Sequence, residues 1–105
     1  MFNSKRLLKL LEKETQKRFG ITGNLNDEIY DIEIEFSELT GTFVQNQHWH
    51  QTQIFQKLDS GNVLMKITCG INRELVGWVF QWMSNAKVLK PKILANMVAN
   101  KLKET

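Results

Sequence analysis

Apolar and polar residues alternate along part of this chain, and elsewhere the apolar residues recur every three or four positions. The clearest alternation is Glu28–Phe36, where the apolar residues from Tyr30 onward are separated by three acids. Successive side chains of a strand point to opposite faces, so this stretch predicts a strand with one apolar and one acidic face. Further strands are predicted at Thr52–Leu58, at Val63–Cys69 and, more briefly, at Lys87–Leu89.

Four segments carry the spacing of an amphipathic helix. They are Ser4–Arg18, Ser37–Gln47, Arg73–Met83 and the stretch that follows Pro91. Ser37 and Asn72 stand where a side chain can cap the first turn of a helix. In the second segment, the apolar residues expected on one buried face are Leu39, Phe43 and Val44.

From residue 28 the predicted order is strand, helix, strand, strand, helix, strand, with one helix before it and one after it. The two middle strands are joined at residues 59–62, where Gly61 can adopt a positive φ. This order predicts an α+β fold of the ferredoxin-like βαββαβ class, an antiparallel sheet with extra N-terminal and C-terminal helices. We expect a helix in residues 1–20 and the domain in residues 21–105. The fold hosts many functions and by itself implies none.

The chain has 105 residues, of which 42% are hydrophobic and 24% charged, as in a single globular domain. No apolar run reaches the roughly 18 residues of a membrane span, and residues 1–20 are too charged for a signal peptide. We therefore expect a cytoplasmic protein with no membrane partner. The single cysteine, Cys69, excludes an internal disulfide and a cysteine-based zinc site.

Charge is unevenly distributed along the chain. Residues 1–18 and 87–105 each carry a net +4, and the residues between them carry −5, for a total of +3. Basic ends of this kind could bind nucleic acid, but interspersed acids favour the solvated faces of two helices.

No set of residues points to catalysis, and we expect neither an enzyme nor a cofactor. His48 and His50 would face one side of a strand, but no nearby carboxylate or cysteine completes a metal site, so no metal is predicted. Cys69 has no neighbouring base and lies on the apolar side of its strand, which favours an inert thiol. The acids of Glu28–Phe36 are expected to be solvated, since a carboxylate run on an exposed face usually is.

Trp78 and Trp82 lie one helical turn apart at the edge of an apolar stripe. They fit an interface or the wall of a ligand site, and equally a neighbouring loop packed against them. Recognition of single-stranded nucleic acid would need aromatic residues on the open face of the sheet, where Phe55 is the one candidate.

Several of these segments, in this order, resemble one known family, the C-terminal extension (WCX domain) of bacterial WYL-domain transcriptional regulators. The resemblance spans residues 19–104. The segments that carry it are the strand 30–36, Trp49-His50-Gln51-Thr52-Gln53, the Asp59-Ser60-Gly61 turn, Arg73-Glu74-Leu75-Val76-Gly77-Trp78-Val79 and Val88-Leu89-Lys90-Pro91-Lys92-Ile93-Leu94. Thr52 stands where the family pattern has Ser, and residues 83–86 replace a glycine-containing turn.

The resemblance implies a regulatory module of a transcription factor, taking part in homodimerisation and relaying effector binding to DNA binding. Such regulators bind DNA through an upstream helix-turn-helix domain and carry a WYL domain, so the chain resembles an excised piece that begins in the helix linking the WYL domain to this one. A nucleotide or nucleic acid is the effector that the resemblance implies. The alternative is a stand-alone ferredoxin-like module that binds a small ligand.

The resemblance also marks site residues. Trp49, His50, Thr52 and Gln53 match the family's W-H-x-S-Q pattern, either as ligand or regulatory contacts or as a structural corner. Candidate interface residues are Glu74 and Trp78, which match the family's helix motif, together with Trp82, Leu7 and Leu11, which lie on apolar stripes of their predicted helices.

Overall fold

The computed structural model describes Asn26 and residues 28–104 of the chain. The helix expected at residues 4–18, with Leu7 and Leu11, lies outside these described residues. The strands are β1 (Tyr30–Phe36), β2 (Ile54–Lys57), β3 (Val63–Cys69) and β4 (Ala86–Lys90). The helices are α2 (Glu38–Gln45), α3 (Arg73–Gln81) and α4 (Lys92–Glu104), with a 3-10 turn at Met83–Asn85. The predicted order of elements from residue 28 is confirmed.

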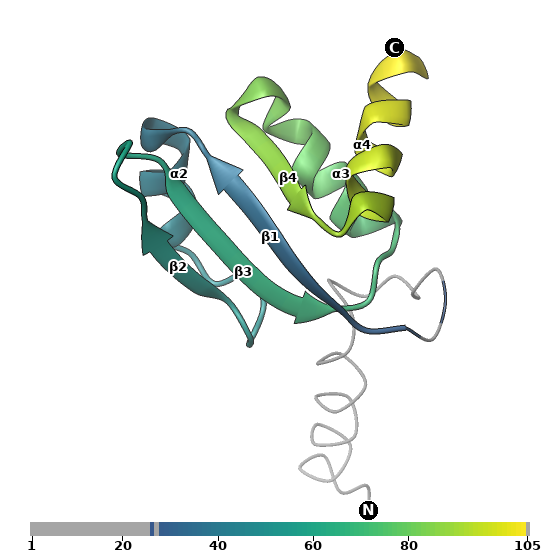
Figure 1. Cartoon of the computed structure of the whole chain (residues 1–105), viewed down its shortest axis with the longest axis horizontal. Helices are drawn as coiled ribbons and strands as arrows, with labels where there is room; N and C mark the ends of the chain where they lie inside the picture. The colour runs from purple at the N-terminus through teal and green to yellow at the C-terminus, as the bar shows by residue number, and fades with distance from the viewer. Residues whose placement is uncertain (1–25, 27, 105) are drawn as a thin grey trace, which may run out of the picture.

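The four strands form one antiparallel sheet in the order β2-β3-β1-β4, so the fold is mixed α+β. The long strands β1 and β3 are central and pair along their whole length, with Ile34 opposite Met65. Figure 1 shows α2 and α3 behind the sheet and α4 beside β4. Helix α4 packs against both β4 and α3. None of the described helices lies over the other face of the sheet, called the open face below (Figure 1).

The core lies between the sheet and the helices. Ile32, Ile34 and Phe36 of β1 are almost fully buried, whereas the acids between them are only partly buried or exposed, as the alternation predicted. Leu94 of α4 is also buried in this core. Burying each large aliphatic side chain contributes about 1.5–3 kcal/mol, so this layer supplies most of the driving force for folding.

The two predicted caps behave differently. Asn72 caps α3, because its Oδ1 accepts a hydrogen bond from the Leu75 N–H at 2.8 Å. Ser37 precedes α2 but its side chain makes no capping bond. Its hydroxyl instead donates to Asn85 Oδ1 at 3.0 Å, which ties the start of α2 to the 3-10 turn.

In α2, the prediction that Leu39 and Phe43 share a buried face with Val44 was wrong. Val44 is fully buried, but Leu39 is 86% exposed and Phe43 52% exposed. The buried residues of the helix are Gly41 and Val44. The helix is rotated because its glycine, rather than its larger side chains, lies against the sheet.

None of the helices within the described part of the chain is long and apolar enough to cross a membrane.

Replacing Gly41 with Ala is expected to destabilise the domain, although alanine is the better helix former. A Cβ at Gly41 would lie 2.5 Å from the Cβ of Val63, so α2 or β3 would have to shift. Such overpacking costs about 1–3 kcal/mol. Gly77→Ala in α3 is the matched control, since nothing lies within 4 Å of its added methyl group. Urea unfolding should show Gly77→Ala as stable as the parent or more so, and equal losses in both variants would contradict this packing.

Met83→Gly is expected to stabilise the domain by about 0.5–1 kcal/mol. Met83 has a φ of +53°, a left-handed conformation that costs a non-glycine residue roughly 1–2 kcal/mol, and its side chain is 62% exposed. The resemblance places a glycine-containing turn at this position. Thermal unfolding of Met83→Gly and of the control Ser84→Gly checks this, and a less stable Met83→Gly would contradict it.

Candidate functional site

Residues Trp49–Gln53, called the corner below, connect α2 to β2. The Gln53 side chain holds the corner together: its Oε1 accepts hydrogen bonds from the Trp49 N–H at 2.6 Å and the His50 N–H at 3.1 Å. Its Nε2 donates to the Gln47 carbonyl at 2.9 Å. The Trp49 indole N–H donates to the Val44 carbonyl at 2.8 Å, at the end of α2. The side chains that match the family pattern therefore bond to the backbone of their own domain.

Thr52 connects the corner to the sheet. Its hydroxyl oxygen accepts a hydrogen bond from the Thr68 N–H of β3 at 2.8 Å, a bond that a neighbouring strand would ordinarily supply. The same oxygen lies 2.8 Å from His50 Nδ1. The predicted strand from Thr52 therefore begins only at Ile54, because the Thr52 side chain takes the place of its backbone in this pairing.

The buried imidazole of His50 has a defined orientation. His50 is 5% exposed, and its Nδ1 accepts a hydrogen bond from the Thr52 N–H at 3.2 Å. An accepting Nδ1 places the proton of the neutral ring on Nε2. His48, in contrast, is exposed, so the two histidines do not share a strand face as the metal hypothesis required. Among Asn26 and residues 28–104, no three potential metal ligands gather in one place.

Three tryptophans and two phenylalanines form one aromatic cluster behind the sheet. The Trp49 and Trp78 rings lie 5.1 Å apart between centroids, and Trp82 lies 6.4 Å from Trp49 and 6.0 Å from Trp78. Phe36 meets both Trp78 and Trp82 edge-on, at 5.8 and 6.4 Å. Phe43 completes the cluster at 5.9 Å from Trp82. The structure thus brings two of the segments that carry the resemblance, the corner and α3, into direct contact.

The candidate interface residues lie in different environments. Trp78 is 8% exposed and its ring packs within the aromatic cluster, so it offers little surface to a partner. Trp82 and Glu74 are half-buried. Exposed apolar side chains instead gather beside Trp82 at Leu39, Phe43 and Met83, called the helix-side patch below. The four-residue spacing of Leu39 and Phe43 was visible in the sequence, but it was assigned to the core.

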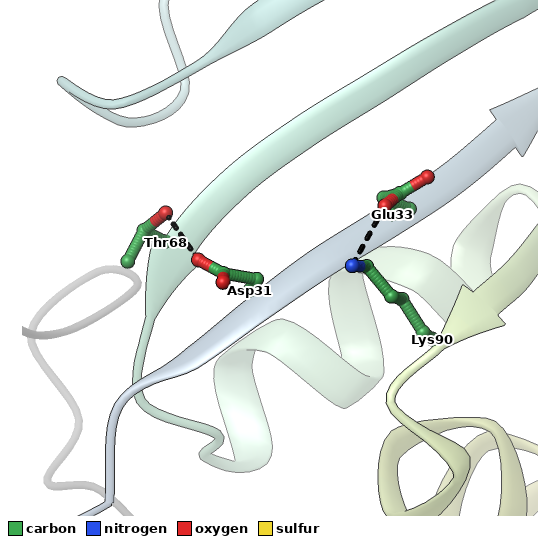
Figure 2. A network of polar contacts seen from close by, with 4 residues as sticks. All are labelled: Asp31, Glu33, Thr68 and Lys90. Carbon is green, nitrogen blue, oxygen red and sulfur yellow. Dashed lines mark hydrogen bonds and ion pairs between the residues drawn. The ribbon is translucent and has the colours of Figure 1, made fainter.

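The acids of β1 were expected to be solvated, but all three have partners within the domain. Lys90 Nζ at the end of β4 lies 2.9 Å from Glu33 Oε2, and Thr68 donates its hydroxyl hydrogen to Asp31 Oδ1 at 3.1 Å (Figure 2). The hydrogen bond that the Lys90 ammonium donates to Glu33 raises the pKa of Lys90, and the charges of Glu33 and Asp31 add to this effect. Glu35 accepts a hydrogen bond from the Asn62 side-chain amide at 2.8 Å. Sequence reasoning missed these partners because they come from distant parts of the chain, two from other strands and Asn62 from the turn before β3.

Two further residues of the sheet face the helices. Phe55, the one aromatic candidate for the open face, pairs with Met65 and packs against the core, so that placement was wrong. Cys69 is fully buried, and burial raises the pKa of its thiol to about 12. The thiol is therefore protonated at neutral pH, as expected for an inert cysteine.

Thr52→Val is expected to destabilise the domain by about 0.5–1.5 kcal/mol, because it removes the hydroxyl that the Thr68 N–H and His50 Nδ1 share. Thr52→Ser keeps the hydroxyl and should remain within about 0.5 kcal/mol of the parent. Urea unfolding of the three proteins measures the difference. Equal stability of the Val and Ser variants would show that the hydroxyl does not hold the corner to β3.

A comparison with family models and a search of curated proteins bear on the identity of the chain. The search of curated proteins gives no match. The model of the WCX domain matches residues 28–105, a range that contains the corner, the aromatic cluster and all four strands. The suspected resemblance is confirmed at the level of the family: the chain belongs to the WCX domain family.

Proposed function

We propose that this domain is the C-terminal regulatory and dimerisation module of a bacterial transcription regulator with upstream helix-turn-helix and WYL domains. The observation that carries the proposal is the family match over residues 28–105. The role is regulatory rather than catalytic, in the cytoplasm, and DNA is bound by the upstream domain. We also assign the fold to the ferredoxin-like class, which the order of elements and the strand order β2-β3-β1-β4 support.

The proposed mechanism is a shift between two arrangements of a homodimer. An effector that binds one dimer arrangement more tightly than the other increases the population of the first. If the two arrangements bind DNA with different affinity, the effector thereby changes the affinity of the regulator for DNA. The WCX domain contributes to this by holding the two chains together in one arrangement. Its rigidity supports such a role, because the aromatic cluster packs α3 against the corner and β1.

The helix-side patch is the surface on which we place the contact with a second copy of the chain. Leu39, Phe43 and Met83 expose 86%, 52% and 62% of their surface, next to the half-buried Trp82. Exposed apolar groups that adjoin one another are characteristic of protein interfaces, and buried tryptophans often carry much of the binding energy. Because each copy of the chain carries the same patch, two copies can bind one another through it around a twofold axis.

Leu39→Glu is expected to raise the dissociation constant of the dimer at least about tenfold, because the charge would be buried against a second apolar patch. Leu39 makes little contact within its own domain, so folding should be unchanged. Leu89→Glu is the matched control, a half-exposed apolar residue on β4 away from the patch. Sedimentation equilibrium across concentration measures the constant.

The same measurement on a chain without residues 1–18 separates the domain from the preceding segment. The proposal is supported by a dimer that survives the truncation and is weakened by Leu39→Glu but not by the control Leu89→Glu. A monomer at all concentrations, or a dimer lost with residues 1–18, contradicts it. In a regulator that carries this domain, Leu39→Glu should also weaken operator binding, since a less populated dimer presents fewer paired helix-turn-helix domains.

A second candidate function, binding of a small ligand, is favoured by one observation. A hollow of about 280 Å³ lies on the open face of the sheet, where four charged side chains and one exposed isoleucine line it. Its volume is close to the lower end of the ~300–1,000 Å³ range of small-molecule sites.

A further inference from the structure

The hollow is lined by side chains from all four strands and from the corner. Asp31 and Glu33 come from β1, and Lys66 lies opposite Glu33 on β3. Lys90 closes one side, and Ile54 of β2 lies opposite Lys66 on the other. Figure 2 shows the carboxylates of β1, Thr68 of β3 and Lys90 of β4 pointing out of the same face of the sheet. Two acids and two lysines make the charge of the lining neutral.

Only two of these four charged side chains form an ion pair with each other within the described part of the domain. The Lys90 ammonium and the Glu33 carboxylate form an ion pair at 2.9 Å and so neutralise one another. Across the described residues, Lys66 has no carboxylate within ion-pair distance, and Asp31 has a hydrogen bond only to one of its oxygens. One ammonium and one carboxylate therefore remain available at the edges of the same hollow.

Asp31 is held in place through the corner. Its Oδ1 accepts from the Thr68 hydroxyl at 3.1 Å, and the Thr68 N–H donates to the Thr52 hydroxyl at 2.8 Å. That hydroxyl in turn lies 2.8 Å from Nδ1 of the buried His50. A carboxylate fixed in this way loses less conformational entropy when it binds a ligand than a freely rotating one.

Ile54 adds an apolar wall to the charged hollow. It lies on the edge strand β2, where it is 62% exposed on the open face of the sheet, beside Lys66. A ligand with an aliphatic group can cover this side chain and remove its apolar surface from water, which is favourable in proportion to the area covered.

We propose that the hollow binds a small zwitterion, a free α-amino acid with an aliphatic side chain, whose ammonium meets Asp31, whose carboxylate meets Lys66 and whose side chain covers Ile54. This inference rests on the second candidate function and names its ligand class. A neutral lining with two unsatisfied charges of opposite sign matches a ligand that is neutral overall and carries both charges. A nucleic acid fits less well, because its phosphates would meet Asp31 and Glu33 and the lining contains no aromatic side chain for base stacking.

Titration calorimetry with leucine tests the proposal, with two analogues that each lack one charge. 4-Methylpentanoate lacks the ammonium, and 3-methylbutylamine lacks the carboxylate. We expect leucine to bind the 105-residue chain at millimolar concentration or tighter, and each analogue at least about tenfold more weakly. Backbone amide shifts of Ile54, Lys66 and Thr68 in the presence of leucine should locate the site in the hollow.

Asp31→Asn and Lys66→Gln remove the two charges without removing bulk, and each is expected to weaken leucine binding at least about tenfold. Lys87→Gln is the matched control, an exposed lysine of the same sheet that does not line the hollow, and it should bind leucine as the parent does. Thermal unfolding of each variant confirms that it is folded.

Three outcomes would overturn the inference: no heat with leucine up to about 10 mM, analogues that bind as well as leucine, or charge variants that bind like the parent. The dimerisation test uses a different surface and a different readout. Absence of leucine binding together with a dimer sensitive to Leu39→Glu would therefore reject the zwitterion site and leave the proposed regulatory role intact. The reverse result would reject dimerisation through the helix-side patch and keep the ligand site.

Discussion

The contact between Trp49 and Trp78, 5.1 Å apart, is the constraint on which the arrangement of the domain depends. It joins the corner that follows α2 to the helix that follows β3, although 28 positions separate the two residues in the sequence. Aromatic pairs contribute about 0.5–1.5 kcal/mol beyond their buried area, and here Trp82, Phe36 and Phe43 extend the contact to α2 and β1. The corner and α3 are therefore fixed relative to the sheet by one continuous cluster.

The corner also determines what the opposite side of the sheet presents to solvent. Thr52 supplies a hydroxyl where β3 lacks a backbone partner, and Thr68, held by that hydroxyl, orients Asp31. The side chains matching the family pattern thus have structural partners on both sides, Trp49 toward the helices and Thr52 toward the open face. A structural role for these residues and an indirect role in ligand binding are compatible, because the same hydrogen bonds serve both.

The two surfaces that we propose for function lie on different sides of the molecule. The helix-side patch is carried by α2 and the 3-10 turn, whereas the hollow lies on the open face of the sheet. A second copy of the chain and a small ligand can therefore be bound together. Coupling between them would run through the corner, which contacts the hollow by Thr52 and the cluster beside the patch by Trp49.

The order of elements, the buried face of β1 and the cap at Asn72 follow from residues close together in the chain, and the family follows from several short segments in a fixed order. The remaining features depend on contacts between distant parts of the chain. Gly41 faces the sheet because it alone permits α2 to approach Val63, and this turned Leu39 and Phe43 outward against their helical spacing. The partners of Asp31 and Glu33 come from β3 and β4, and the local pattern of β1 contains no information on which distant side chains pairing will place beside it.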